Sequence, residues 1–251
     1  MKPIACITGA SSGIGEATAY ELNKMGYRLI LLARRADRLA QVVNNIKADG
    51  GEVFSAELDV RNQTAVADFF AQLPVEWQEI SVLVNNAGLA QGLSKIYEGD
   101  IAHWDAMIDT NVKGLLYVTR AVTPGMVARK SGHVINIGSI AGKEVYDNGN
   151  VYCASKFAVD ALNKAMRMEM AVHGVRVTGI HPGAAETEFS VVRFQGDEER
   201  AKKVYEGFEN LVAADIADAI GWVVSRKPHV NINDLVIMPQ AQAVAGVIIR
   251  K

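Results

Sequence analysis

Near its start the chain reads Thr8-Gly9-Ala10-Ser11-Ser12-Gly13-Ile14-Gly15, directly after a short apolar segment at residues 3–8. The apolar segment is typical of a buried strand, and residues 14–25 are typical of a helix. Glycines at such a junction let the backbone turn tightly and approach a phosphate, which the free N–H groups of a helix N-terminus also favour. The spacing G-x-x-x-G-x-G is not the common G-x-G-x-x-G fingerprint, and no Gly-Lys-Ser/Thr follows, which excludes a P-loop. We predict a pyrophosphate site formed by Gly9, Ser11, Ser12, Gly13, Ile14 and Gly15, with a glycine-rich turn without a ligand as the alternative.

The pattern of strand, turn and helix repeats along the chain. Apolar runs predict further strands at residues 28–33, 52–58, 81–84, 133–138, 175–181 and 235–238. Helices are predicted between them at residues 37–49, 63–73, 105–128 and 152–172, with C-terminal caps at Gly26, Gly50, Gly132 and Gly174. No linker or internal repeat divides the sequence. We therefore predict one Rossmann-type α/β domain over residues 1–251, with a doubly wound parallel sheet and helices on both faces.

Composition excludes several classes of protein. Of 251 residues, 49% are hydrophobic and 22% charged, and the net charge of −2 comes without a basic run, which argues against a nucleic-acid or anionic-membrane surface. No apolar stretch is long enough to span a membrane or to act as a signal peptide, so we expect a cytoplasmic protein. The two cysteines, Cys6 and Cys153, are expected to be buried apolar residues. The scattered histidines show no metal-ligand spacing, so no metal site is expected.

Three residues suggest proton-transfer chemistry. Tyr152 and Lys156 stand four positions apart and so share one helix face, which brings an ammonium beside a phenol oxygen. A nearby positive charge lowers the pKa of a tyrosine, and Ser139, thirteen residues upstream, can hold a substrate oxygen while Tyr152 exchanges a proton with it. Such a pair alone is weak evidence, because an exposed lysine beside a packed tyrosine is common on helices.

With Asn85-Asn86-Ala87-Gly88, these motifs closely resemble the short-chain dehydrogenase/reductase family from end to end. The resemblance implies hydride transfer between a nicotinamide cofactor and an alcohol or carbonyl carbon. It places a catalytic tetrad at Asn111, Ser139, Tyr152 and Lys156, in which Asn111 holds a water of the proton relay and Lys156 binds the nicotinamide ribose. It also implies a homotetramer built on the long helices, whose small residues Ala154, Ala158 and Ala161 would suit contact with another helix or with the sheet.

The end of the second strand indicates which nicotinamide is bound. An NAD enzyme of this kind would place a carboxylate there for the ribose 2′-hydroxyl. The sequence instead has Arg34 and Arg35, and guanidinium groups bind a phosphate bidentately. We therefore predict NADP. By resemblance, the remaining cofactor contacts fall on Asp59, Val60, Asn86, Ala87, Gly88, Tyr152, Lys156, Pro182, Gly183 and Thr187.

A charged segment at about residues 186–208 follows the sixth strand, where a doubly wound sheet presents its ligand crevice. We predict that its part from Phe189 to Phe194 forms a lid over the substrate. Several segments resemble the NADP-dependent 3-hydroxy acid dehydrogenases, which act on serine, L-allo-threonine, 3-hydroxyisobutyrate or malonic semialdehyde. Such a substrate carries a carboxylate, for which Arg193 is the candidate beside Ser139 and Tyr152, with a surface arginine as the equal alternative. Glu144 or Glu186 is a weaker candidate for a substrate amino group.

Two other functions stay open at this stage. A reductase of 3-oxoacyl thioesters shares the same tetrad, but it would need an open groove and a basic docking patch, which the sequence does not show. A regulator that binds NADP and a partner protein without turnover is the alternative outside the enzymes. The complete tetrad argues against it.

Overall fold

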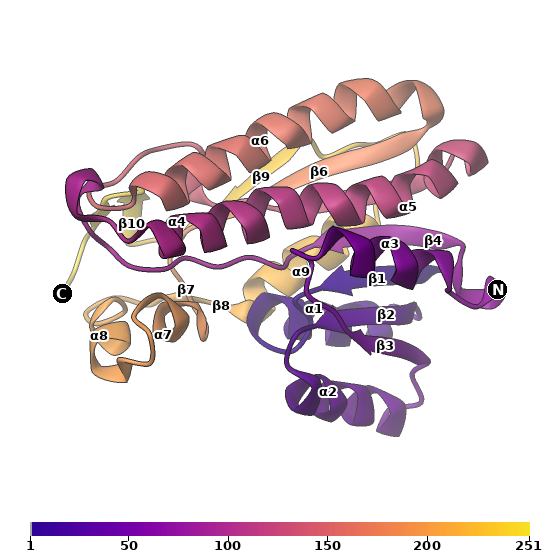
Figure 1. The fold of residues 1–251 in the computed structure, drawn as a ribbon, viewed down its shortest axis with the longest axis horizontal. Coiled ribbons are helices and arrows are strands. Elements are labelled where there is room, and N and C mark those ends of the chain that lie inside the picture. The colour runs from indigo at the N-terminus through magenta and orange to yellow at the C-terminus, as the bar shows by residue number, and fades with distance from the viewer. Residues whose placement is uncertain (1) are drawn as a thin grey trace.

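The computed structural model describes residues 2–251 and contains the seven parallel strands expected from the sequence (Figure 1). They form one sheet in the order β3-β2-β1-β4-β5-β6-β9. The order reverses between β1 and β4, and open α/β sheets bind ligands beyond the carboxyl ends of the strands at such a reversal. The strands are β1 (Ile4–Thr8), β2 (Arg28–Ala33), β3 (Val53–Glu57), β4 (Ile80–Asn85), β5 (Gly132–Ile137), β6 (Val175–Pro182) and β9 (Asp234–Ile237).

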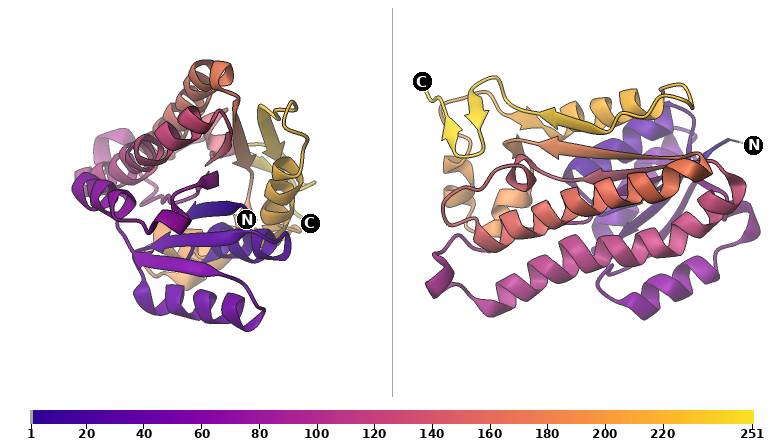
Figure 2. Two further views of the ribbon diagram at one scale, coloured as in Figure 1. Left: turned by 90° about the vertical axis from the view of Figure 1, so that its right-hand side faces the viewer. Right: turned by 90° about the horizontal axis from the view of Figure 1, so that it is seen from above.

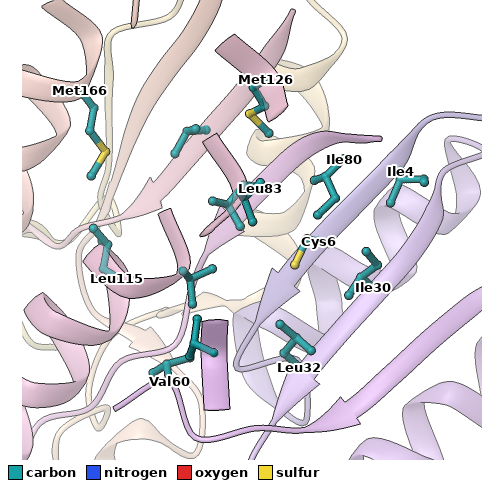
Figure 3. Close-up of a cluster of buried hydrophobic side chains, with 14 of the residues drawn as sticks. Ile4, Cys6, Ile30, Leu32, Val60, Ile80, Leu83, Leu115, Met126 and Met166 are labelled. Atoms are coloured by element: carbon teal, nitrogen blue, oxygen red, sulfur yellow. The ribbon is translucent and has the colours of Figure 1, made fainter. Parts of the chain in front are cut away.

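Helices cover both faces of the sheet, as predicted (Figure 2). One face packs against α3 (Gln63–Ala71), α5 (Leu115–Arg129) and α6 (Asn150–Met170), and the other against α1 (Gly13–Lys24), α2 (Ala36–Ala48) and α9 (Ala213–Val224). Successive strand residues point to opposite faces, so Ile4 and Cys6 enter the first core and Ala5 and Ile7 the second. Figure 3 shows the first core, in which Cys6 is fully buried among aliphatic side chains.

The predicted helix at residues 105–128 is longer than expected and interrupted. It begins with α4 (Ile101–Ile108), widens into a π-helical turn at Asp109–Gly114 and continues as α5. A π-helical turn inserts extra backbone without breaking the helix, so apolar periodicity does not reveal it. This turn contains Asn111, one of the four predicted catalytic residues.

One of the four predicted glycine caps is wrong. Gly26, Gly50 and Gly174 follow helix ends with positive φ, but after α5 it is Lys130 that adopts the left-handed conformation, with φ of 53°. Gly132 is instead the first residue of β5, and a Cβ there would lie 2.6 Å from the side chain of Met126. Close packing of β5 on α5 therefore explains this glycine, and cap geometry does not.

The segment after β6 projects beyond the carboxyl edge of the sheet as two short helices, α7 (Phe189–Arg193) and α8 (Glu198–Lys203) (Figure 1). Two small strand pairs not anticipated from the sequence accompany it. The pair β7 (Ala185–Glu186) and β8 (Leu211–Val212) closes the base of the segment, and β10 (Gln242–Val244) with β11 (Val247–Ile248) ends the chain. No helix among residues 2–251 has both the length and the apolar character that crossing a bilayer requires.

Candidate active site

A cleft of about 310 Å³ runs along the carboxyl edge of the sheet, at the reversal between β1 and β4. It extends from the arginines after β2, past the glycine-rich turn, to the tyrosine and lysine of α6. An extended dinucleotide needs this arrangement, with a cationic end, a backbone cradle and a reactive end. The predicted residues that line the cleft are Gly9, Ser11, Ser12, Gly13, Ile14, Arg34, Arg35, Asp59, Val60, Asn86, Ala87, Gly88, Ser139, Tyr152, Lys156, Pro182, Gly183 and Thr187.

The glycine-rich turn leaves no room for a side chain at Gly9 or Gly15. Gly9 has φ of +67°, and a Cβ on Gly15 would lie 2.3 Å from the carbonyl oxygen of Gly9. The side-chain amide of Asn86 donates to the carbonyls of Thr8 (2.9 Å) and Gly9 (3.2 Å), so β4 holds the turn in place. Gly15 itself does not line the cleft; its absent side chain lets α1 start close to the turn. The turn thus keeps its backbone open to close approach by a ligand, and pyrophosphate binding here stays a prediction.

The arginines at the other end of the cleft differ in their partners. Arg34 is exposed. Arg35 donates to the hydroxyl of Ser12 (2.6 Å) and to the carboxylate of Glu188 (2.9 Å). Asp59 is paired with Arg61, whose hydrogen bonds are the main cause of the lowered pKa of the Asp59 carboxyl. This end of the cleft therefore offers cationic donors, and its two lining carboxylates, Asp59 and Glu188, are both paired with arginines.

At the opposite end, α6 presents Tyr152 and Lys156 to the cleft. The ammonium of Lys156 is buried and donates to the carbonyl of Ile137 (2.9 Å), and burial lowers the pKa of Lys156 to about 8. Burial disfavours the charged form of Tyr152 as well, and so raises the pKa of this phenol, whereas the charge of Arg193 and a hydrogen bond with Ser139 lower that pKa. This differs from the expectation that Lys156 lowers the tyrosine pKa, because the ammonium turns toward Ile137 and lies 6.0 Å from the centre of the phenol ring.

Asn111 lies next to this pair but does not line the cleft. Its side-chain amide accepts from the backbone N–H of Leu89 (2.8 Å) and donates to the carbonyl of Leu89 (2.9 Å) and the hydroxyl of Ser155 (3.0 Å). Both amide hydrogens are therefore engaged within the protein. The side chain fixes the loop after β4 against α6, and a role in holding a relay water stays a prediction.

The predicted lid lies over the reactive end. Phe189 and Val192 of α7 line the cleft, and the rings of Phe189 and Tyr152 lie 5.6 Å apart. Arg193 lines a small adjoining cavity that shares Tyr152 with the cleft. Its guanidinium carbon lies 5.0 Å from the centre of the Tyr152 ring, and Nη2 donates to the hydroxyl of Tyr146 (2.9 Å).

Neither acidic candidate for a substrate amino group reaches this place. Glu144 accepts from the backbone N–H of Ala245 (2.8 Å), and Glu186 is exposed and accepts from the side-chain amide of Asn210 (2.9 Å). Neither residue lines the cleft or the smaller cavity.

The sequence also gave no sign of a buried ionic cluster behind the site. Lys143, just after Ser139, donates to Asp160 of α6 (2.6 Å) and to Asp234 of β9 (3.3 Å), and His181 of β6 contacts Asp234 (3.1 Å). Two carboxylates and an imidazole could ligate a metal ion, but the ammonium of Lys143 already supplies positive charge between them. The cluster ties three elements that carry site residues to one another.

Residues 3–198 match the short chain dehydrogenase family, and the chain belongs to it. Across 99% of both chains it is 45% identical to the NADP-dependent 3-hydroxy acid dehydrogenase YdfG of Salmonella typhi, and across 97% of both chains it is 44% identical to the protein of the same name from Escherichia coli K12. Among solved structures, the closed form of serine dehydrogenase complexed with NADP+ superposes with a TM-score of 0.93, at 43% identity and 99% coverage of both chains. A serine dehydrogenase from Escherichia coli gives 0.83 at 39% identity, covering 96% of this chain and 99% of that one.

Proposed function

We propose that the protein is an NADP-dependent oxidoreductase that interconverts a small 3-hydroxy acid and the corresponding carbonyl acid. The family assignment supports the reaction type, and the names of the two relatives support both the cofactor and the substrate class. The observation that carries the substrate proposal is Arg193, a partly buried cation beside Tyr152 that forms no ion pair with any carboxylate of residues 2–251.

Preference for NADP over NAD follows from the charges at the end of the cleft. Arg34 and Arg35 meet the cleft where a ribose 2′-phosphate of an extended dinucleotide would lie. Cations at the start of α2 are unfavourable beside the positive end of the helix dipole unless an anion compensates for them, and a phosphate would do so. NAD would bring only a hydroxyl to this place, and no lining carboxylate is free to accept from it.

The bound nicotinamide supplies or accepts the hydride. In the reducing direction, Ser139 and Tyr152 hold the carbonyl oxygen, and Tyr152 donates a proton to that oxygen as it becomes a hydroxyl. In the oxidising direction, the phenolate of Tyr152 takes that proton, and the positive charge of Arg193 favours the phenolate. Lys156 holds positive charge near the ring and, by resemblance to the family, contacts the cofactor ribose. A positioned acid or base of this kind contributes about 10²–10⁴ in rate.

The carboxylate of the substrate is assigned to Arg193. Arginine presents planar N–H donors that match a carboxylate, and here one nitrogen is bonded to Tyr146 while the buried Nε has no partner among the described residues. A 3-hydroxy acid carries its carboxylate two carbons from the reacting carbon, with one carbon between them, so the carboxylate can extend past Tyr152 toward the smaller cavity that Arg193 lines.

A 3-oxoacyl thioester is a poorer fit for the same tetrad. Such a substrate requires an open groove for a long carrier arm, whereas Phe189 and Val192 close the cleft beside Tyr152. A regulator without turnover would not need Ser139, Tyr152 and Lys156 together in one cleft. Both alternatives make predictions that one assay separates.

That assay follows NADPH absorbance with the purified protein and five substrates: L-serine, L-allo-threonine, 3-hydroxyisobutyrate, malonic semialdehyde and a 3-oxoacyl thioester. Each substrate is paired with NADP(H) and with NAD(H). Turnover of the small acids with NADP(H) and little turnover with NAD(H) is expected. Activity on the thioester alone would support the reductase, and cofactor binding without turnover would support the regulator.

We also propose a cytoplasmic homotetramer. The outward face of α6 supports assembly through this helix, since Ala154 and Ala161 are exposed and the large apolar residues Phe157 and Met168 are 41% and 79% exposed. A stripe of small and apolar residues on a helix surface suits close contact with another subunit. Sedimentation or light scattering of the purified protein tests the oligomer.

A further inference from the structure

Glu188, which no prediction from the sequence singled out, joins the lid to the arginine end of the cleft. Its carboxylate accepts from Arg35 (2.9 Å) through one oxygen and from Arg38 through the other. Both guanidinium groups hold the pKa of the Glu188 carboxyl below its ordinary value against the opposing effect of burial. Glu188 directly precedes α7, and Arg193 is the last residue of the same helix.

The lid is therefore held at two places that lie at opposite ends of α7. At its start, Glu188 contacts Arg35 and Arg38. At its end, the carbonyl of Arg193 accepts from the backbone N–H of Gly92 (3.1 Å), and Gln195 bonds to His103 (3.0 Å). The first attachment lies at the predicted 2′-phosphate site and the second beside the predicted substrate pocket.

A charge count shows that Glu188 and a 2′-phosphate can share the arginines. Arg34, Arg35 and Arg38 supply three positive charges and Glu188 removes one, which leaves two. A phosphate monoester carries nearly two negative charges at neutral pH, so it would bring the group close to neutrality. Donors also remain, because Arg35 uses one nitrogen for Glu188 and another for Ser12 out of a fork of five N–H groups.

We propose that Glu188 is a positioning residue that couples the 2′-phosphate to closure of the lid. A phosphate bound to the remaining N–H donors orders Arg35 and Arg38, the ordered arginines lose less side-chain entropy in holding Glu188, and Glu188 fixes α7 with Arg193 over the substrate. Discrimination between NADP and NAD would then occur in substrate binding as well as in cofactor affinity. The inference rests on the proposed function for its cofactor and for the role of Arg193.

Limited proteolysis tests the coupling without any turnover. Trypsin can cleave the segment at residues 186–208 after Arg200, Lys202 and Lys203, which are exposed on α8 directly after the lid, once this segment opens locally. Saturating NADPH should slow this cleavage more than saturating NADH does, by up to about fivefold, the upper end of what partly exposed ion pairs contribute. In Glu188→Gln that difference should disappear, and the protein without cofactor should be cleaved faster than the wild type.

Glu186→Gln is the matched control, because it removes the same charge from the same segment but contacts Asn210 and neither arginine. Glu188→Gln should raise KM for the carboxylated substrate by up to about fivefold, with a smaller change in kcat and in NADPH affinity measured by fluorescence. Glu188→Asp should recover part of this loss, and Arg38→Met should reproduce it. Equal behaviour of the two glutamine variants would overturn the proposal. The proposal would also be overturned if Glu188→Gln were cleaved by trypsin at the wild-type rate, or if the variant lost affinity for NADPH and nothing else. If no substrate were turned over, the proteolysis would still decide the coupling.

Discussion

Replacing Arg193 by methionine tests the part of the proposed function on which the substrate class depends. Methionine keeps an apolar side chain at this position, so the change removes chiefly the guanidinium, whose carbon lies 5.0 Å from the centre of the Tyr152 ring and 5.1 Å from that of Phe189. Hydrogen bonds to a charged group contribute about 1.5–3 kcal/mol. A carboxylate held by Arg193 should therefore lose about 10- to 150-fold in kcat/KM, at tenfold for each 1.4 kcal/mol.

The assay compares L-serine with its methyl ester at saturating NADP. The ester has the same reacting alcohol but no carboxylate, so Arg193→Met should cost the acid far more than the ester. Arg200→Met is the matched variant, because Arg200 belongs to the same lid but stacks on Phe194 (4.4 Å), and it should leave both substrates near wild type. Equal losses for acid and ester, or a loss for L-serine below about threefold, would refute the assignment.

The same variant carries a pH signature. Since the charge of Arg193 lowers the pKa of Tyr152, its removal should raise that pKa. Oxidation requires the phenolate, so the acid limb of its pH profile should move to higher pH in Arg193→Met, for acid and ester alike. An unmoved limb would show that Arg193 acts on the carboxylate alone.

Three further predictions concern the rest of the site. Tyr152→Phe should lower kcat by about 10²–10⁴ while NADPH binding, followed by fluorescence, stays near wild type; substantial retained turnover would contradict its role. The buried Lys156 has a pKa lowered to about 8, so the folded state binds fewer protons than the unfolded state between about pH 8 and 10.5. This difference makes the free energy of unfolding rise with pH in that window. Lys156→Met should remove up to about 3 kcal/mol of that rise, measured by denaturation at pH 7 and pH 10, whereas an unchanged rise would place the cause elsewhere. Gly15→Ala should lower Tm by several degrees, since a collision with backbone costs about 1–3 kcal/mol, and should weaken NADPH binding, whereas Gly50→Ala, away from the cleft, should affect Tm alone.

The fold was predictable because its signals are local. The five inner strands, β1, β2, β4, β5 and β6, are short runs buried on both faces, and the edge strands β3 and β9 are partly exposed. Each run stands alone in the sequence between turn residues. The glycine-rich turn and the Tyr152 and Lys156 pair depend on spacing within a few residues, so their placement in the cleft could be anticipated. The helix α9, which lies between the lid and the last predicted strand, was not predicted, although its buried residues Ile216, Ile220 and Val223 recur at helical spacing.

The site contacts that could not be predicted join residues far apart in the chain. Glu188 and Arg35 are separated by 153 positions, and Lys143 and Asp234 by 91. A local sequence pattern does not reveal such partners, because the residues beside a glutamate in the sequence do not show whether it lies at a site or on the surface. The effect of Lys156 on the pKa of Tyr152 was mispredicted for a related reason. Helix spacing placed Lys156 on the correct face of α6, but its ammonium donates to the carbonyl of Ile137, which belongs to the distant strand β5.

The crowded glycine-rich turn also limits where the cofactor preference of this protein can change over evolution or by engineering. Around Gly9 and Gly15, backbone atoms and the Asn86 amide occupy the space of any added Cβ. Substitution of either glycine would therefore disrupt the turn and would not change its preference between the two nucleotides. The charges that we propose to discriminate NADP from NAD belong instead to the exposed or half-exposed side chains of Arg34, Arg35 and Glu188, where substitution costs little packing. Substitution of these side chains can therefore change the preference between NADP and NAD while the glycine-rich turn keeps its conformation. A switch toward NAD should be sought by replacing the two arginines with a carboxylate and a neutral residue, leaving the turn untouched.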